Sequence, residues 1–302
     1  MHGKAAVSGD AGYAVPHSAG TQAPRAKAPA NACDCHMHIF DPRFPALPHW
    51  KRQPPKATVE DYRLFQRRIG TSRTVVVTPS TYGTDNRCTL DAVREMGAAA
   101  RAVAVVDTSV SDAELKRLAR SGVCGIRVNF ISTQSWGVTT ADMLMTLSKR
   151  VNDLDLDWHV QVFMHGDQIV EMENVLGHLP IPLVIDHLGR IPQPAGVGHP
   201  AFTAIRRLLD KGKTWVKLSG AYMDAQEGPP HYADIGHVAR ALVGAAPERL
   251  VWGSDWPHTI ASTVPDDAVL FDLLADWAPQ ESVRRRILVS NPEVLYGFPP
   301  AV

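Results

Sequence analysis

Eight short apolar runs alternate with helical patterns along this chain of 302 residues, and this alternation constrains the fold more than any other feature. Runs such as Thr74-Val-Val-Val and Arg101-Ala-Val-Ala-Val-Val are apolar throughout, as expected of parallel strands buried on both faces. The predicted strands are residues 32–40, 74–80, 101–107, 123–130, 158–164, 182–189, 214–220 and 250–258.

The segments between these runs are amphipathic and predict helices. Ser111 and Glu114 fit a capping box, and Thr84-Asp85 can cap the helix that follows it. Eight strands with their helices over about 270 residues predict a single (β/α)8 TIM barrel of the α/β class. An open doubly wound sheet is the alternative, but no Gly-x-Gly-x-x-Gly motif follows any of the strands. The predicted helices are residues 59–69, 84–96, 111–120, 141–154, 167–179, 202–209 and 232–243, with closing helices at 266–277 and 281–288.

Composition separates the chain into two parts. Residues 1–30 are rich in Ala, Gly, Pro and Ser and predict a disordered leader, whereas residues 31–302 form the barrel domain. The 31 basic and 31 acidic side chains balance, which argues against nucleic acid or an anionic membrane as a partner. No apolar stretch approaches the roughly 20 residues that span a bilayer. Four cysteines suggest no disulfide framework, so we expect a cytoplasmic protein; its oligomeric state is left open.

His36 and His38 stand two residues apart near the end of the first predicted strand. Side chains at this spacing share one face of a strand, so the two imidazoles should project together. Such a pair can hold a metal ion or a water, or can polarise a carbonyl group. A pair of structural strand histidines is the alternative for this motif taken alone.

Further polar side chains fall at the carboxyl ends of other predicted strands, where barrels gather functional groups. His187 follows the sixth strand and Asp255 follows the eighth, within Trp252-Gly-Ser-Asp255-Trp-Pro-His258. A buried aspartate in an apolar strand needs a partner because an unpaired buried charge costs several kcal/mol. The histidines are the candidate partners. We therefore expect one active site at the barrel mouth.

These motifs resemble the amidohydrolase superfamily over nearly all of residues 31–298, and Gly83-Thr-Asp-Asn86, Gly125-Ile-Arg-Val-Asn129 and Asp186-His-Leu-Gly-Arg190 resemble its lactone-processing branch. The resemblance implies that Asp255 is the general acid/base. It implies that His36, His38 and His187 orient water or polarise the lactone carbonyl. Arg127 and Arg190 match arginines that bind a substrate carboxylate.

The resemblance also bears on metal content. The fourth strand ends at Asn129-Phe130 and lacks the bridging Lys or Glu that is usual in binuclear members, so we expect no metal and no other cofactor. A zinc held by His36, His38 and Asp255, with His165 as a possible further ligand, is the alternative.

Two departures from the pyrone-dicarboxylate pattern indicate the substrate. Thr133 stands where that pattern has a second arginine, and Phe163 stands where it has a tyrosine. The best match is isomerisation of D-galactaro-1,5-lactone to the 1,4-lactone. Lactone hydrolysis is the first alternative and a zinc-dependent decarboxylase the second; a barrel that only binds sugar acids is the non-catalytic alternative. The loop 44–56, with Trp50, is either a substrate wall or a solvated connection. The expected substrate-binding residues are Arg127, Arg190, Ser80, Tyr82, Asn129, His165, Tyr222 and His258.

Overall fold

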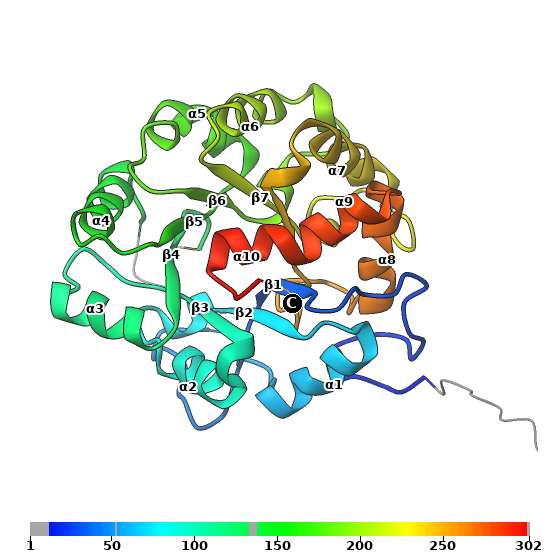
Figure 1. The fold of residues 1–302 in the computed structure, drawn as a ribbon, viewed down its shortest axis with the longest axis horizontal. Helices are drawn as coiled ribbons and strands as arrows, with labels where there is room; N and C mark the ends of the chain where they lie inside the picture. The colour runs from blue at the N-terminus through cyan, green and yellow to red at the C-terminus, as the bar shows by residue number, and fades with distance from the viewer. Residues whose placement is uncertain (1–11, 52, 133–137, 301–302) are drawn as a thin grey trace, which may run out of the picture.

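The computed structural model describes residues 12–51, 53–132 and 138–300, and it confirms the predicted barrel. Eight parallel strands follow one another in sequence order around the sheet, each paired with the next (Figure 1). The strands are β1 (Cys33–Met37), β2 (Arg73–Val77), β3 (Ala100–Ala104), β4 (Val123–Asn129), β5 (His159–Phe163), β6 (Leu183–Ile185), β7 (Thr214–Leu218) and β8 (Leu250–Trp252).

The helices cover the outside of this ring, as Figure 1 shows. They bury apolar stripes against the outward faces of the strands, in a core that includes Val160, Val162 and Val216. The helices are α1 (Val59–Ile69), α2 (Arg87–Met96), α3 (Asp112–Arg120), α4 (Ala141–Asp153), α5 (Gly166–Leu176), α6 (Pro200–Asp210), α7 (Ala233–Ala245), α8 (Asp267–Trp277), α9 (Glu281–Arg285) and α10 (Asn291–Tyr296).

Local signals explain where several helices begin. Ser111 accepts a hydrogen bond from the backbone of Glu114 at 3.1 Å, which is half of the predicted capping box; the Glu114 carboxylate pairs with Arg117 instead of completing it. The second helix begins at Arg87 rather than at Thr84. Its N-cap residue, Asn86, makes no capping hydrogen bond, but Oδ1 of Asp85 accepts from the backbone N–H of Arg87 at 3.0 Å, as the sequence suggested for Thr84-Asp85. The last predicted helix, 281–288, begins as α9, continues through a π-helical turn over residues 286–290 and extends beyond its predicted end as α10.

The two ends of the barrel differ. Tyr296 at the end of α10 and the nearby Phe298 pack on an inner cluster with Cys33 and Cys35 from the start of β1. In Figure 1, α10 lies across this end of the ring. The amino ends of the strands are therefore covered, and the functional groups belong to the opposite end.

Closure of the ring uses residues just beyond β8 rather than β8 itself. Met37 forms a parallel bridge with Trp256, and the backbone N–H of Asp255 donates to the carbonyl of His36 at 2.8 Å. The regular register of β1 against β2 shifts between Asp34 and Met37. The first and last functional segments are thus joined by backbone hydrogen bonds.

Residues 12–30 differ from the expected disordered leader, while residues 1–11 lie outside the described part of the chain. Val15 is buried, and the Trp256 indole donates to the carbonyl of Pro16 at 2.9 Å. The guanidinium of Arg68 donates to the carbonyls of Ala19 and of residue 22. Buried donors of the barrel therefore hold a segment that has no regular structure of its own.

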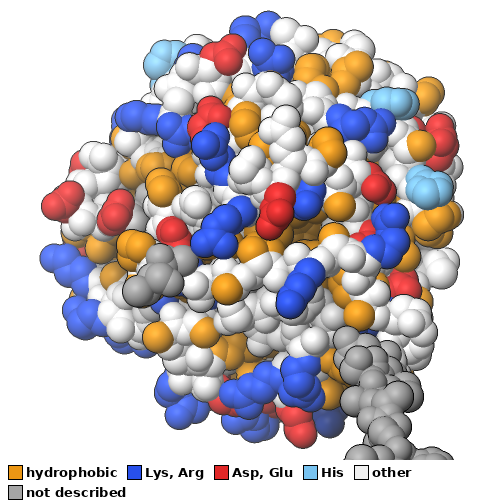
Figure 2. Space-filling view, turned by 45° about the vertical axis from the view of Figure 1, so that its right-hand side comes forward, with side chains coloured by type: hydrophobic (Ala, Val, Ile, Leu, Met, Phe, Trp, Pro, Cys, Tyr) orange, Lys and Arg blue, Asp and Glu red, His pale blue; other side chains and the backbone are white. Residues whose placement is uncertain are grey.

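Charged side chains of both signs are interspersed over the face drawn in Figure 2, in keeping with the net charge of zero. Within the described residues, no helix is long and apolar enough to cross a bilayer.

Candidate active site

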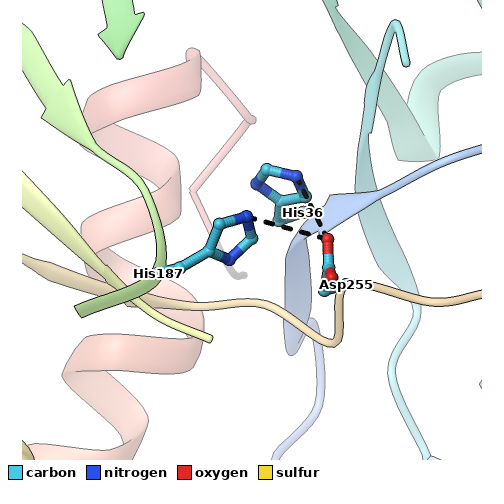
Figure 3. Close-up of side chains that lie close together, drawn as sticks. All are labelled: His36, His187 and Asp255. Carbon is cyan, nitrogen blue, oxygen red and sulfur yellow. Dashed lines mark ion pairs between the residues drawn. The ribbon is translucent and has the colours of Figure 1, made fainter. Parts of the chain in front are cut away.

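The predicted catalytic residues meet at the carboxyl end of the barrel. The Nε2 atoms of His36, His38 and His187 lie 3.5, 3.6 and 3.8 Å from Oδ1 of Asp255. Figure 3 shows His36 and His187 approaching this carboxylate from two different strands. All four side chains are buried. One carboxylate oxygen therefore faces three imidazole edges.

Unusual backbone geometry turns two of these residues into the site. His187 has φ 50° and Asp255 has φ 62°, both in the left-handed region. Strands β6 and β8 end at Ile185 and Trp252, earlier than the sequence predicted, because the chain must leave the strand path to aim these side chains. Strain of this kind is common at functional sites.

Each imidazole is also held at its Nδ1 edge. Nδ1 of His38 donates to the carbonyl of Val77 at 2.8 Å, because a carbonyl can only accept. Nδ1 of His187 lies 2.9 Å from Oγ of Ser219, which can donate or accept. These second partners fix the ring orientations, as they do in many histidine sites.

His36 has a charged environment at its Nδ1 edge. The ammonium of Lys217 and Oδ1 of Asp186 each lie 3.3 Å from this nitrogen. Lys217 also donates to Gln161 Oε1 at 2.7 Å and to a backbone carbonyl of β1 at 2.9 Å. Asp186, Lys217 and Gln161 form a buried network beneath His36 that the sequence analysis did not assign. A charged residue inside an otherwise apolar strand, such as Lys217 in Thr-Trp-Val-Lys-Leu, was the available signal.

Burial and neighbouring charges set the protonation states. Burial lowers the pKa of His187 to about 4, and burial together with Lys217 holds the pKa of His36 well below its ordinary value. Burial alone would raise the pKa of Asp255, but the surrounding histidines, His187 first, lower it below the ordinary value. At neutral pH the site therefore presents the neutral imidazoles of His36 and His187 beside a carboxylate, which can accept a proton.

Arg127 and Arg190 both stand over the ring of Phe163. Their guanidinium carbons lie 4.9 and 5.6 Å from the centre of the Phe163 ring. Arg127 donates from Nε to Asp186 at 3.0 Å, and Arg190 donates from Nε and one terminal nitrogen to Asp224. The remaining guanidinium N–H groups are available for an anionic ligand.

A cavity of about 200 Å³ opens beside this cluster. Trp50 lines it, so the loop 44–56 contributes a wall; Arg52 of that loop and Thr133 lie outside the described residues. Seven of the lining side chains are apolar: Phe40, Trp50, Pro79, Ile131, Phe163, Met223 and Ile260. The cavity is lined by His38, Phe40, Trp50, Pro79, Ser80, Thr81, Arg127, Asn129, Ile131, Ser132, Phe163, His187, Arg190, Met223, Asp255, Thr259 and Ile260.

Half of the expected substrate-binding residues line this cavity, namely Arg127, Arg190, Ser80 and Asn129. The amide of Asn129 is already engaged, because it donates to Ser80 Oγ at 2.6 Å and accepts from two backbone N–H groups.

Four other expected residues are not in the lining, as far as the described residues show it. Tyr82 is buried behind Phe40, with the ring centres 6.0 Å apart, and His165 is exposed at the start of α5. Tyr222 donates to Asp255 Oδ2 at 2.6 Å, and His258 contacts Tyr222. Strand-end position predicted the barrel mouth correctly but could not distinguish the cavity wall from the layer behind it.

The donor set fits a zinc ion in its spacing. His36, His187 and Asp255 offer ligand atoms within 4.8 Å of one another, and the Nε2 atoms of His36 and His38 are 3.3 Å apart. Zinc bonds of about 2.0–2.1 Å in a tetrahedron place neighbouring donors about 3.4 Å apart. A zinc held here by these residues would polarise a carbonyl or lower the pKa of water. The spacing of these donors is therefore compatible with a zinc ion.

Known proteins resemble this chain over most of its length. The profile of the Amidohydrolase family matches residues 33–298. The chain is 36% identical to the 4-sulfomuconolactone hydrolase of Hydrogenophaga intermedia over 276 residues, which is 89% of each chain. It is 33% identical to the D-galactarolactone isomerase of Agrobacterium fabrum over 283 residues, covering 92% of this chain and 95% of that protein. A crystal structure of an Agrobacterium tumefaciens protein in its apo form superposes with a TM-score of 0.84 at 33% identity, covering 92% of this chain and 100% of that one.

Proposed function

This chain belongs to the amidohydrolase family and is an enzyme, and we propose that it opens the ring of a small anionic lactone by general-base catalysis without a metal. One observation carries the proposal. A buried carboxylate, Asp255, faces three imidazoles at the wall of a cavity that also contains two arginines. A lactone substrate is supported by two relatives, which are named as a 4-sulfomuconolactone hydrolase and a D-galactarolactone isomerase.

The chemical steps assign one role to each group. Asp255 takes a proton from the attacking hydroxyl, and the oxygen forms a bond to the lactone carbonyl carbon. The tetrahedral oxyanion is stabilised by N–H donors among the imidazoles. When the intermediate collapses, the ring C–O bond breaks and the departing oxygen takes the proton from Asp255. Water as the nucleophile gives the hydroxy acid and restores the enzyme.

The hydrogen-bond partners support a metal-free course. Lys217 is within donor distance of His36 Nδ1, and Ser219 can donate to His187 Nδ1. With Nδ1 accepting, each neutral ring carries its hydrogen on Nε2, directed toward the cluster. That hydrogen can stabilise an oxyanion, whereas a metal needs the Nε2 lone pair.

Charge balance at the site supports the same course. Arg127 pairs with Asp186, and Arg190 pairs with Asp224. Lys217 and Asp255 add one charge of each sign, so these six charges sum to zero. A divalent cation would add two positive charges beside Lys217 and the two arginines.

The cavity lining supports an anionic lactone with an apolar ring face. Both arginines reach the cavity, and Phe40, Trp50 and Met223 provide apolar contact. Of the polar groups expected to bind the hydroxyls of a sugar-acid lactone, Ser80 and Asn129 line this cavity, whereas Tyr82, His165 and Tyr222 are not in the lining. Hydrolysis is therefore the reaction that we place first.

Isomerisation of D-galactaro-1,5-lactone to the 1,4-lactone is the second candidate. It uses the same residues, with a hydroxyl of the substrate replacing water as the nucleophile. The hydroxyl of Ser80 at the cavity wall and the relationship to the D-galactarolactone isomerase of Agrobacterium fabrum favour it.

The test is a proton NMR time course on chelator-treated protein of measured metal content. Two substrates are compared, 4-sulfomuconolactone and D-galactaro-1,5-lactone. Turnover of either one without metal supports the proposal, and the product distinguishes an open acid from an isomeric lactone. Activity that returns only with zinc would overturn the metal-free mechanism. If the wild-type protein turns over neither lactone, even after zinc is restored, the proposed substrate class is wrong.

A further inference from the structure

Tyr222 and His258 contact Asp255 from the side opposite the histidines, and we infer that Tyr222, His258 and Asp267 form a hydrogen-bonded chain that positions this carboxylate for reaction. The inference rests on the proposed function because it takes Asp255 as the base. It replaces the expectation that Tyr222 and His258 bind substrate.

The hydrogen-bonded chain from Asp255 to Asp267 is continuous in the structure. The Tyr222 hydroxyl donates to Oδ2 of Asp255 at 2.6 Å. The same hydroxyl oxygen lies 3.2 Å from Nδ1 of His258, whose Nε2 lies 3.0 Å from Oδ1 of Asp267. Three separate elements contribute: the turn after β7, the segment after β8, and the first residue of α8.

The number of hydrogens on each group determines the direction of every hydrogen bond from Asp255 to Asp267. Tyr222 has one hydroxyl hydrogen, and the carboxylate of Asp255 can only accept it. Nδ1 of His258 must therefore donate to the Tyr222 oxygen, and Nε2 must donate to Asp267. His258 then carries a hydrogen on both nitrogens and is an imidazolium paired with the Asp267 carboxylate.

The electrostatic surroundings agree with this assignment. Burial alone would lower the pKa of His258, but Asp267, Asp255 and Asp34 together raise it above its ordinary value. Burial and the Asp255 carboxylate raise the pKa of Tyr222 well above its ordinary value, so this residue stays a hydroxyl donor.

The far end of the chain is anchored. Asp267 is buried, and its backbone N–H donates to Oγ of Ser18 at 3.1 Å. Its carboxylate stands at the amino end of α8, where the helix dipole favours a negative charge. The chain therefore runs from a fixed helix end to the reacting group.

As a consequence, the two carboxylate oxygens of Asp255 have different roles. Oδ2 is held by Tyr222, while Oδ1 faces the three histidines. Only Oδ1 is then directed to the nucleophile. Tyr222 is a positioning residue, and His258 acts through it.

The first test is a double-mutant cycle with Tyr222→Phe and His258→Gln, measured as kcat and KM on the lactone turned over by the wild type. We expect Tyr222→Phe to lower kcat by about 10- to 100-fold with KM within about 2-fold, the effect of losing one hydrogen bond to a charged group. The double variant should match Tyr222→Phe alone, because both changes act through one hydroxyl. Tyr296→Phe is the matched control, since the hydroxyl of this buried tyrosine has no hydrogen-bond partner among the described residues. A rise in KM as the main effect, or losses that multiply, would restore the substrate-binding interpretation.

A second measurement does not depend on turnover. Nitrogen-15 NMR of histidine-labelled protein should show both ring nitrogens of His258 protonated at neutral pH, with the Nδ1 signal shifted in Tyr222→Phe. A neutral His258 ring, or a signal unaffected by that change, overturns the inference even in an active enzyme. The expected spectrum from a protein that turns over no lactone would support the chain while the proposed function fails.

Discussion

The backbone N–H of Asp255 donates to the carbonyl of His36 at 2.8 Å, and this one hydrogen bond both closes the barrel and brings the base beside the histidine pair. The carboxylate of Asp34 strengthens the same junction, since it accepts hydrogen bonds from the backbone and hydroxyl of Ser254. The site is thus built where the first and last strands meet. Its geometry depends on closure of the fold.

Replacing Asp255 with asparagine tests the role of the base. Asp255→Asn keeps the shape of the side chain but removes the proton acceptor, so we expect kcat to fall by about 10²- to 10⁴-fold. Circular dichroism and thermal unfolding should show a folded protein. Asp153→Asn, at an exposed carboxylate of α4, is the control and should keep full activity. Near-normal turnover by Asp255→Asn would exclude the mechanism.

Arg190 provides the test for anion recognition. Arg190→Met removes a guanidinium at the cavity wall while keeping an unbranched side chain, and we expect KM to rise by about 10- to 100-fold for an anionic lactone. kcat should change far less, because the contact is present in both the ground state and the transition state. Arg207→Met is the control, since Arg207 pairs with Glu173 on the exterior helices. An unchanged KM in Arg190→Met would place the anion elsewhere.

Strand periodicity and strand-end position were sufficient to predict the barrel and its four central side chains. The alternation of apolar runs with helices is a local pattern, and the rule that functional groups gather at carboxyl ends converts it into a place for His36, His38, His187 and Asp255. The structure brings these residues together within 4 Å of one oxygen.

The remaining features depend on contacts that no local pattern encodes. Tyr222 follows a strand just as Ser80 does, yet Ser80 lines the cavity and Tyr222 lies behind Asp255. The leader composition predicted disorder over residues 12–30, because the buried donors of Arg68 and Trp256 that hold this segment are distant in sequence. Left-handed turns at His187 and Asp255 ended two strands earlier than their apolar pattern suggested.

His159 makes the protein sensitive to acid. It is buried, neither ring nitrogen has a hydrogen-bond partner among the described residues, and burial lowers its pKa to about 3. Below about pH 6.5 the unfolded chain takes up a proton at this residue while the folded state does not, so stability falls as pH decreases toward 3. This residue contributes up to about 1.4 kcal/mol per pH unit across that range.

Removing the imidazole of His159 should therefore make the free energy of unfolding depend less on pH below about 6.5. We expect the difference in the free energy of unfolding between wild type and His159→Leu to shift in favour of the variant from pH 6.5 to pH 4. Denaturant unfolding at each pH measures this difference, with the values at pH 8 as the internal reference. A difference that stays constant with pH would show that His159 titrates alike in both states.

Zinc should inhibit rather than activate. The cluster of His36, His187 and Asp255 has the spacing of a zinc site, so an added ion would bind the Asp255 carboxylate and the imidazole nitrogens. We expect a chelator to leave kcat unchanged and excess Zn²⁺ to lower it, with recovery on chelation. The measurement is initial rate against free zinc concentration. Loss of activity on chelation, with recovery on adding zinc, would reverse this prediction.

Lys217 provides the most direct test of how His36 is oriented. It is fully buried at the centre of the barrel and is not among the residues that line the cavity, so it acts on catalysis through the groups beside it, His36 at 3.3 Å and Asp186 at 3.7 Å. Lys217→Met keeps the volume of the side chain but removes the donor to His36 Nδ1. The imidazole can then donate from Nδ1 to Asp186, which lies 3.3 Å away, and its Nε2 becomes a lone pair.

In the wild type, Nδ1 of His36 either accepts from Lys217 or donates to Asp186, and these two assignments predict opposite results for Lys217→Met. If Nε2–H stabilises the oxyanion, kcat should fall by about 10-fold or more while KM changes little. The exposed Nε2 lone pair should at the same time strengthen zinc binding, which isothermal titration calorimetry measures without turnover. Unchanged kcat and unchanged zinc affinity in Lys217→Met would mean that His36 already donates to Asp186 in the wild type, and that the oxyanion is stabilised by His187 alone.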